Sequence, residues 1–346
     1  MTRRLALGIS ISPTWLRAER WRSADSRVEE LFELAPFSDL ARDAEAAGFD
    51  VLFAPDAGHL DPDVLDRSPG FSTLDSHTLV SALAAVTQRI GLVPTVQTTF
   101  ASPYDTARRI MSLHRISGGR AGWNAVTSLG GHENHGIATP PASEERYDRA
   151  RRFVETVHAL WESYPAGAIV ADRASGRFAH GVGRVDAHGV AGPLPVEAHA
   201  SGHPPLFQAG GSPAGVAFAG SAADAVFGMA GDLDAALAQR SALRDAAERA
   251  GRDPDAVRFL PGLSVGGAGG AHWTLAGDGA AIADGIARFA DAGAIDGFIA
   301  LPASWTAMRV LFDEVAPRLV ERGMAWGASG PLALRGRLGM DTAAPR

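Results

Sequence analysis

Short apolar runs alternate with segments of helical periodicity along the whole chain. Eight runs predict strands, near residues 5–11, 50–55, 90–97, 120–127, 205–209, 224–228, 257–263 and 297–301. Helices are expected between them, at about 37–47, 76–88, 103–116, 144–164, 213–221, 232–250, 279–292 and 306–322. The clearest is 144–164, where apolar side chains recur at three- and four-residue steps and form one stripe: Tyr147, Ala150, Val154, Val157, Trp161 and Tyr164.

This alternation is typical of a parallel α/β protein, in which every helix returns the chain to the sheet. Eight strands in a chain longer than the ~250 residues of a minimal barrel favour a (β/α)8 TIM barrel with loop insertions over an open doubly wound sheet. We expect one domain over 1–346, with insertions near 12–35, 56–75, 128–143 and 165–204. All but the first are expected close to the C-terminal ends of strands, where loops build barrel active sites.

Composition narrows the range of functions. A chain of 346 residues with 46% hydrophobic residues can bury a large core, and its net charge of −7 with scattered arginines argues against a nucleic-acid partner. No stretch approaches the ~20 apolar residues of a membrane span, so we expect a cytoplasmic protein without membrane contact. Cysteine and lysine are both absent, which excludes thiolate nucleophiles, Schiff-base lysines and Walker-type phosphate loops.

The segment "FQAGGSPAGVAFAG" (207–220) is a candidate anion site. A strand ends before a glycine pair, Gly211 leaves the backbone accessible, Ser212 is placed as a helix N-cap and Pro213 suits the first helical turn. Free amides at a helix N-terminus bind phosphate, although a capped turn without a ligand would have the same sequence. No complete G-x-G-x-x-G follows a strand, which argues against an integral NAD(P)-binding domain.

Other polar residues stand where strands end. Asp56 follows the second strand, Thr95 lies in the third, and Asn124 lies beside Trp123 in "SGGRAGWNAVTS" (117–128). Polar side chains at these ends of a barrel are often catalytic or cofactor-binding, and each could alternatively be a cap or a satisfied core group. His132 and His135 in "GHENHG" have no helical ligand spacing, so we expect polar loop residues and no metal site there.

Taken in order, several segments resemble one known family: "SGGRAGWNAVTS", "ENHG", "ERYDRARRFVETVHALWESY", "GPLP", "HPPLFQAGGSPAG", "AADAVF" and "AGAIDGFIALPA". They are similar to the flavin-dependent monooxygenases of the bacterial-luciferase superfamily. Within it, the nitrilotriacetate and dibenzothiophene-sulfone monooxygenase branch is the most similar. "ERWR" (19–22) also resembles the early Trp-Arg pair of that branch.

The resemblance implies a TIM barrel that binds reduced FMN (FMNH2) supplied by a separate NAD(P)H:flavin reductase. With O2 it would oxygenate a small organic substrate through a flavin (hydro)peroxide, in a homodimer or higher homo-oligomer. By the same resemblance Asp56 and Thr95 lie along the isoalloxazine and ribityl chain, and Asn124, the catalytic candidate, lies close to the flavin. Tyr147 reaches the phosphate region, which is cradled by Gly211 and Ser212.

Two features depart from the family pattern. Where the family usually places a flavin-contacting histidine, this chain has Ser143, which is retained as a cofactor-binding candidate by its position and could alternatively be a helix N-cap before Glu144 and Glu145. The segment 264–279 is also shorter than the corresponding lid insertion of close relatives. Three alternatives stay open: a deazaflavin-dependent oxidoreductase of the same superfamily, a metal-dependent barrel hydrolase using the histidines, and a non-catalytic flavin-binding protein. The sequence does not identify the substrate.

Overall fold

The computed structural model describes residues 4–128, 130–267 and 271–340. Its centre is a closed barrel of parallel strands in the order β10-β9-β4-β3-β2-β1-β13-β11, and pairing of β10 with β11 closes the ring. The strands are β1 (Ala6–Ser10), β2 (Val51–Ala54), β3 (Gly91–Gln97), β4 (Trp123–Val126), β9 (Leu206–Ala209), β10 (Ala225–Gly228), β11 (Arg258–Val265) and β13 (Gly297–Pro302). The predicted (β/α)8 barrel is therefore confirmed.

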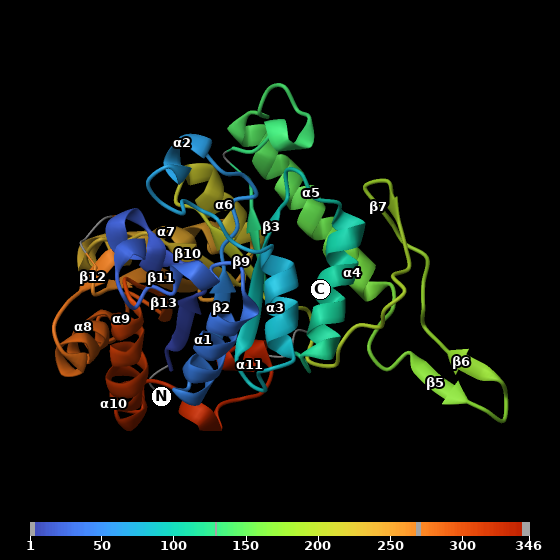
Figure 1. The fold of residues 1–346 in the computed structure, drawn as a ribbon. Coiled ribbons are helices and arrows are strands. Elements are labelled where there is room, and N and C mark those ends of the chain that lie inside the picture. Colours follow the sequence, from blue (N-terminus) through green and yellow to red (C-terminus); the bar gives the residue numbers. More distant parts are fainter. Residues whose placement is uncertain (1–3, 129, 268–270, 341–346) are drawn as a thin grey trace.

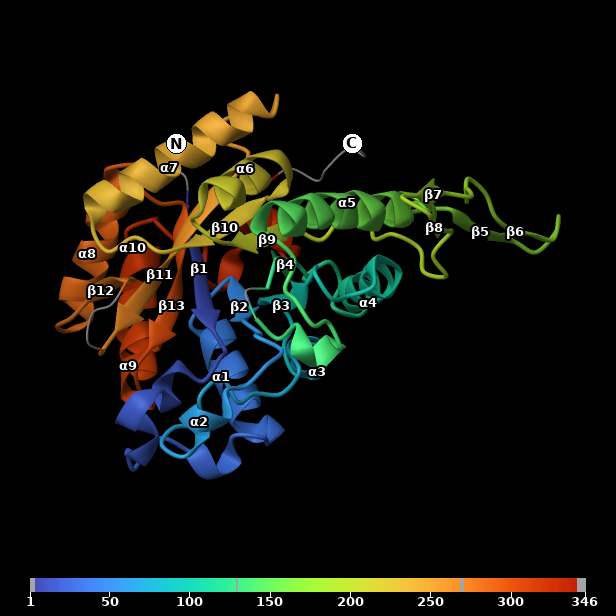
Figure 2. The same cartoon turned by 90° about the horizontal axis from the view of Figure 1, so that it is seen from above.

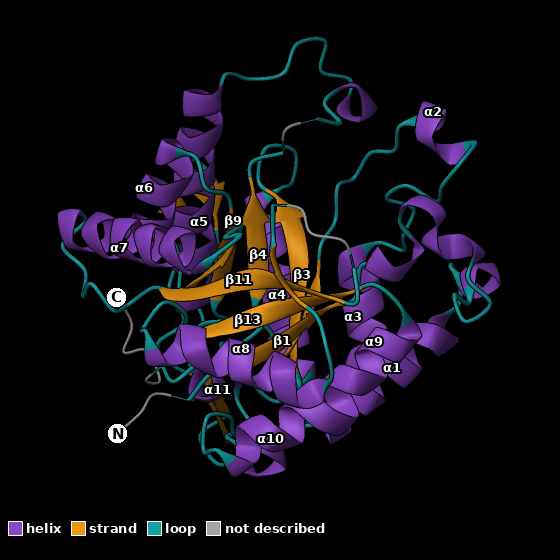
Figure 3. Cartoon of the chain, turned by 90° about the vertical axis from the view of Figure 1, so that its left-hand side faces the viewer, coloured by secondary structure: helices purple, strands orange, loops and turns teal. Residues whose placement is uncertain are grey.

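Helices surround this barrel (Figures 1 and 3). They are α1 (Leu34–Ala46), α3 (Ser76–Ala84), α4 (Pro103–Ile116), α5 (Ser143–Glu162), α6 (Pro213–Ala222), α7 (Leu233–Arg249), α8 (Gly279–Asp291), and α9 (Trp305–Val310) with α10 (Ala316–Glu321). The last two were expected as one helix over 306–322, and a π-helical turn at Leu311–Val315 interrupts it. Two short helices, α2 (Pro62–Leu65) and α11 (Leu334–Arg337), were not predicted. No helix of the described residues is long and apolar enough to cross a membrane.

Side-chain caps fix where many of these helices begin. In each case an Asp or Ser oxygen accepts a backbone N–H of the first turn, which is otherwise unpaired in a helix. These residues are Asp75, Ser102, Ser212, Asp232, Asp278 and Ser304. Proline at the first helical position reinforces the starts of α4 and α6. Each of these caps follows a strand and its loop, so the capping residues turn the chain from the sheet into the helical layer.

Large apolar side chains fill the barrel interior. Phe53, Phe207 and Leu260 are buried there in one cluster with Ile299, and Leu334 of α11 packs against them. The rings of Phe53 and Phe207 lie 6.0 Å apart between centroids. The interior is therefore solid below the strands' C-terminal ends, and a ligand can enter only from that face, which we call the mouth.

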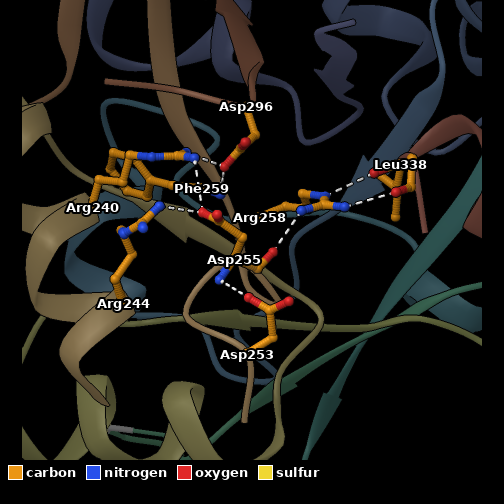
Figure 4. Close-up of polar contacts among 9 residues, drawn as sticks. Arg240, Arg244, Asp253, Asp255, Arg258, Phe259, Asp296 and Leu338 are labelled. Carbon is orange, nitrogen blue, oxygen red and sulfur yellow. Dashed lines mark hydrogen bonds and ion pairs between the residues drawn. The ribbon is translucent and has the colours of Figure 1, made fainter. Parts of the chain in front are cut away.

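Charged side chains stabilise the opposite face, where the strands begin. Arg258 donates to the carbonyls of Leu338 and Gly339 over 2.9 and 2.7 Å, and Asp296 pairs with Arg240 while accepting the Phe259 N–H (Figure 4). A second ion pair at this face joins Arg337 Nη1 to Asp50 Oδ1 over 2.7 Å, and both side chains are almost completely buried. Residues at the N-terminal face of a TIM barrel serve stability, and these contacts do so by fixing the strand ends and the C-terminal segment.

The insertions differ from the expected arrangement, in which all but the first lie near the C-terminal ends of strands. The 165–204 segment follows the C-terminal end of α5 and precedes β9, so its placement near a strand's C-terminal end was wrong. It forms two hairpins, β5 (Ile169–Asp172) with β6 (Arg177–Ala179) and β7 (Asp186–Ala187) with β8 (Val190–Ala191). The first projects away from the barrel beyond α4 and α5 (Figures 1 and 2). In contrast, the 12–35 segment follows β1 directly and belongs to the mouth.

Candidate functional site

Asn124 and Thr95 form a hydrogen-bonded pair at register partners on β4 and β3. Asn124 Nδ2 donates to Thr95 Oγ1 over 2.9 Å, and that hydroxyl donates to the Ala54 carbonyl over 2.9 Å. Because the Thr95 proton is used on Ala54, its oxygen can only accept from Asn124, which fixes the orientation of the amide. Asn124 is 2% exposed, and its Oδ1 is buried without a hydrogen-bond partner among the described residues. This oxygen can accept a hydrogen bond from a ligand.

Asp56 organises the loop that leaves β2. Its Oδ1 accepts the Gly58 N–H over 3.0 Å and its Oδ2 accepts the Ser76 N–H over 3.1 Å. The Ser76 hydroxyl in turn donates to the Thr95 carbonyl over 3.2 Å, so Asp56 and Thr95 are linked through one residue. Both line a cavity of about 330 Å³ together with Gln97. The structure thus brings these two predicted residues to one site.

A cradle for an anion lies at the N-terminus of α6. Ser212 Oγ accepts the Gly215 N–H over 3.1 Å, and the Tyr147 hydroxyl lies 3.4 Å from the same oxygen. A Cβ added at Gly211 would meet nothing within 4 Å, whereas one at Gly215 would stand 2.8 Å from the Tyr147 hydroxyl. Gly211 therefore opens space in front of the helix, and Gly215 allows Tyr147 to approach the cap.

Gln208 was not among the predicted site residues, although it points into this cradle. It is 2% exposed, and its Oε1 is buried without a hydrogen-bond partner among the described residues. Its Nε2 lies 2.7 Å from the position of a Cβ on Gly210 and 3.5 Å from that of a Cβ on Gly215. A glutamine in an otherwise apolar strand, two residues before the glycine pair, was the signal that could have identified it.

The predicted residues follow one arc of the mouth. Asp56, Thr95, Asn124 and Ser212 come from or directly follow β2, β3, β4 and β9, which are consecutive neighbours in the sheet. Tyr147 joins them from α5, where it is 9% exposed and packs against Phe218 with a centroid distance of 6.0 Å. The arrangement provides an acceptor inside the barrel at Asn124 and donors at the α6 terminus.

Ser143 stays a cofactor-binding prediction, but the alternative that it is a helix N-cap is wrong. The N-cap of α5 is Ala142, and Ser143 is the first helical residue, exposed and without a capping hydrogen bond. A side chain at the first helical position already points away from the free amides of the first turn, which explains the difference. Glu144 and Glu145 do lie in the first turn, as expected.

Several histidines contact other side chains, and the described residues do not bring the histidines together as a set of metal ligands. His135 stacks on Phe100 with ring centroids 4.2 Å apart, and His188 pairs with Glu155 over 2.8 Å on the outer side of α5. His199 contacts the buried His114 at a ring distance of 5.2 Å. In the part of the chain that the structure describes, no group of three or more His, Asp or Glu side chains is placed to hold a metal ion.

Comparison with known proteins identifies the family. The model of the luciferase-like monooxygenase family matches residues 14–266, more than half of the chain. The chain belongs to this family. Its residues are 38% identical over 256 positions to dibenzothiophene-sulfone monooxygenase of Rhodococcus erythropolis, covering 69% of this chain and 56% of that protein. Nitrilotriacetate monooxygenase component A of Aminobacter aminovorans is 34% identical over 263 positions, which cover 71% of this chain and 58% of that protein.

These matches confirm the resemblance to the luciferase-like family and its dibenzothiophene-sulfone and nitrilotriacetate branch. The chain aligns with little more than half of the length of both relatives. Among solved structures, riboflavin lyase in complex with modified FMN and riboflavin superimposes with a TM-score of 0.88 at 24% identity, covering 98% of this chain and 96% of that one. This structural similarity independently supports the barrel fold of the chain.

Proposed function

We propose that this luciferase-like protein is the oxygenase component of a two-component system, using FMNH2 and O2 to oxygenate a small organic substrate. The observation that carries the proposal is the arc described above. An anion cradle at α6 and an unpartnered buried acceptor at Asn124 lie on neighbouring strands of one barrel mouth. FMN has a phosphate at one end and a ring with N–H groups at the other, so it matches both.

The residues present fit this cofactor at the phosphate end. Gly211 leaves room for a phosphate, and Ser212, Tyr147 and the backbone amides of α6 supply donors. The positive end of the helix dipole adds to the attraction. Gln208 directs an amide toward the same space, where its Nε2 can donate to a phosphate oxygen.

At the ring end, the chain's own groups position and shield the flavin. Asn124 Oδ1 would accept a hydrogen bond from a ring N–H, while Thr95 holds the Asn124 amide in place and Asp56 keeps the loop after β2 ordered. Phe207 and Phe227 form an apolar floor with Phe53, whose centroid distances to them are 6.0 and 5.3 Å. Such a floor keeps water from below the reacting atoms. When bound, reduced FMN activates O2 and supplies one oxygen atom to the substrate.

The family supports the class of reaction rather than one substrate. Relatives are named for dibenzothiophene sulfone, nitrilotriacetate, dimethyl sulfide and long-chain alkanes, which differ in charge and size. Since the sequence contains no nicotinamide fingerprint, a separate NAD(P)H:flavin reductase would supply the reduced flavin. The homo-oligomer and the single-domain organisation stay predictions.

Anaerobic titration with FMNH2, followed by the same titration with reduced deazaflavin, tests the proposal. We expect saturable binding of FMNH2 and weaker binding of the deazaflavin. An oxygen pulse should then give slower release of H2O2 than free FMNH2 does, because the bound flavin is shielded. S212A and Y147F should each weaken FMNH2 binding by about tenfold, the usual effect of losing one hydrogen bond to a charged group.

A matched control is Y104F, which removes a tyrosine hydroxyl outside the α6 cradle. It should leave FMNH2 affinity unchanged. Absence of FMNH2 binding, or unchanged affinity in both S212A and Y147F, would overturn the assignment. Preference for the deazaflavin would instead indicate the hydride-transferring branch of the superfamily.

A further inference from the structure

A pocket of about 420 Å³ lies outside the barrel, between α4, α5 and the β7–β8 hairpin. These elements lie side by side on one flank of the molecule (Figures 1 and 2). Ala101 and Pro103 line the pocket where α4 begins, and His188 and Val190 line it from the hairpin. Its described lining contains none of the residues assigned above to the flavin. This outer pocket, as we call it, has a volume typical of sites for small molecules.

One face of α5 forms the remaining wall of the outer pocket. Arg149, Arg152, Phe153 and Thr156 line it, and their spacing of three, four and seven residues places them on the same side of the helix. Phe153 is 5% exposed and its ring lies 6.4 Å from that of Trp123, whereas both arginines are exposed. The Thr156 hydroxyl already donates to the Arg152 carbonyl over 2.8 Å. The pocket therefore has an apolar floor below two guanidinium groups.

Neighbouring carboxylates leave these two positive charges without a partner. In the part of the chain that the structure describes, neither Arg149 nor Arg152 forms an ion pair. Asp148, on the same helix, pairs with Arg151 over 2.7 Å. Asp105, in the first turn of α4, lines the groove between α3 and α4 instead. The positive end of the α4 dipole adds to the attraction of the outer pocket for an anion.

His188 binds the carboxylate that could otherwise neutralise Arg152. Glu155 lies three residues after Arg152 on α5, within reach of it, but its Oε2 lies 2.8 Å from His188 Nε2. His188 has a φ of 54° and forms the two-residue turn of the hairpin with Gly189, whose φ is 79°. Asparagine or glycine adopts this left-handed conformation more easily than histidine does. The histidine at this position indicates a role for its ring, which holds Glu155 away from the arginines.

We propose that the outer pocket binds an organic anion in which a carboxylate or phosphate group is attached to a compact apolar body, such as a single ring. Arg149 and Arg152 bind the oxyanion, because a planar guanidinium donates two parallel hydrogen bonds to such a group. The apolar body packs on the floor that contains Phe153. This site goes beyond the proposed function, since it requires neither flavin nor oxygen.

Calorimetric titration with matched probes tests the outer pocket. The purified protein is titrated with benzoate, phenyl phosphate, the neutral isostere benzamide and inorganic phosphate, each without FMN and with saturating FMN. We expect both aromatic anions to bind more tightly than benzamide, which lacks the charge, and than inorganic phosphate, which lacks the ring. The ratio of the affinities for benzoate and phenyl phosphate shows which oxyanion the arginines prefer. FMN should leave these affinities unchanged, because the proposed flavin contacts lie elsewhere.

Variants of the lining residues assign the binding to this pocket. R149Q/R152Q should weaken binding of both aromatic anions by at least about tenfold, as expected when charge-assisted hydrogen bonds are lost. H188N preserves the turn, since asparagine tolerates the left-handed conformation, but it releases Glu155 to pair with Arg152 and should also weaken binding. Adding E155Q to H188N should restore the affinity, because the competing carboxylate is then neutral.

R151Q is the matched control, because Arg151 is an exposed arginine of the same helix that already pairs with Asp148. It should leave the affinity for both aromatic anions unchanged, and unchanged thermal melting of all variants establishes that they are folded. Absence of benzoate binding, equal affinity for benzamide, or an unaffected R149Q/R152Q variant would overturn the proposal. Displacement of benzoate by FMN would also overturn it, since the anion would then occupy the α6 cradle. The titrations without FMN do not depend on the proposed function, so the two proposals can fail separately.

Discussion

Asn124 combines two properties that rarely occur together, deep burial and an unpartnered acceptor. A buried oxygen without a partner costs about 1–3 kcal/mol, so a fold keeps one chiefly where a ligand completes it. We predict that N124L leaves the free energy of unfolding within about 1 kcal/mol of the wild type, since Thr95 retains its bond to Ala54. FMNH2 affinity should fall by about tenfold. Chemical denaturation and anaerobic titration measure the two quantities.

N124D provides the contrast at the same position. Its carboxylate would face the Thr95 oxygen, whose proton is already donated to Ala54, so two acceptors would be opposed in the interior. This variant should therefore be less stable than N124L. A large loss of stability in N124L with unchanged flavin affinity would show that Asn124 serves packing alone.

Arg120 and Asn124 belong to one sequence motif but have different roles, which the sequence alone did not distinguish. It stands four residues before Asn124, yet its guanidinium donates to the carbonyls of Ser117, Ile90, Ala84 and Thr87 and to the Thr87 hydroxyl. Ser117 ends α4, and the other groups lie where α3 ends and β3 begins. Arg120 is thus structural, and Trp123, fully buried against Trp161, is too. The motif's polarity indicated a candidate site, and the three-dimensional contacts single out Asn124 within the motif.

The α6 terminus allows a test of an element rather than of a side chain. A Cβ at Gly211 meets nothing within 4 Å, so G211V should fold normally while its side chain occupies the proposed phosphate position. We predict a loss of FMNH2 affinity larger than in S212A, because the ligand is excluded and not merely deprived of one hydrogen bond. Titration with FMNH2 gives the affinities, and circular dichroism verifies α6 and the rest of the fold.

G183V is its control. Gly183 lies in the outer 165–204 segment, and a Cβ there also meets nothing within 4 Å. The two variants therefore introduce the same side chain into open space at different places. Equal flavin affinity in both variants would show that the α6 cradle does not bind FMNH2.

The strands and helices were predictable because their signals are local. Continuous apolar runs mark strands covered on both faces, and residues such as Asp75 and Ser212 cap the helices that follow. The 165–204 hairpins were not recognised, since an exposed hairpin needs no apolar pattern, and Phe178 there is 64% exposed. Their position was wrong for a topological reason: the segment follows a helix, and loops after helices lie away from the mouth.

The two faces of the barrel differ in their contacts: stabilising ion pairs lie where the strands begin, and the proposed ligand contacts lie where the strands end. Buried ion pairs such as Asp50 with Arg337 lie where strands begin, and unpartnered polar atoms such as Asn124 Oδ1 and Gln208 Oε1 lie toward the strands' C-terminal ends. Burial raises the pKa of Asp50 to about 6, even though the Leu7 N–H and Arg337 favour its anion. Sequence reasoning located the mouth from polar strand ends. It missed Gln208, although a glutamine in an otherwise apolar strand was a local signal for that residue.

The stability of the whole molecule should fall in acid through His114. This side chain is 0% exposed, its Nδ1 lies 3.1 Å from the Ala121 carbonyl and its Nε2 3.0 Å from Ser201 Oγ. Burial, then the neighbouring His199, lower the pKa of His114 to about 3. In the unfolded chain the value is about 6.5, so between these limits the unfolded state binds more protons. The free energy of unfolding therefore decreases as the pH falls below about 6.5, by at most about 1.4 kcal/mol per pH unit from this group.

Denaturant unfolding of wild type and H114Q at several pH values between 7 and 4.5 measures this contribution. H114Q should be less stable at pH 7, because it loses packing and the Ala121 contact. Its stability should depend less steeply on pH, because the neutral amide takes up no proton on unfolding. H188Q removes one imidazole from the outer side of α5, where that ring is 45% exposed, and should retain the wild-type slope. Parallel pH profiles for all three proteins would show that His114 does not govern acid stability.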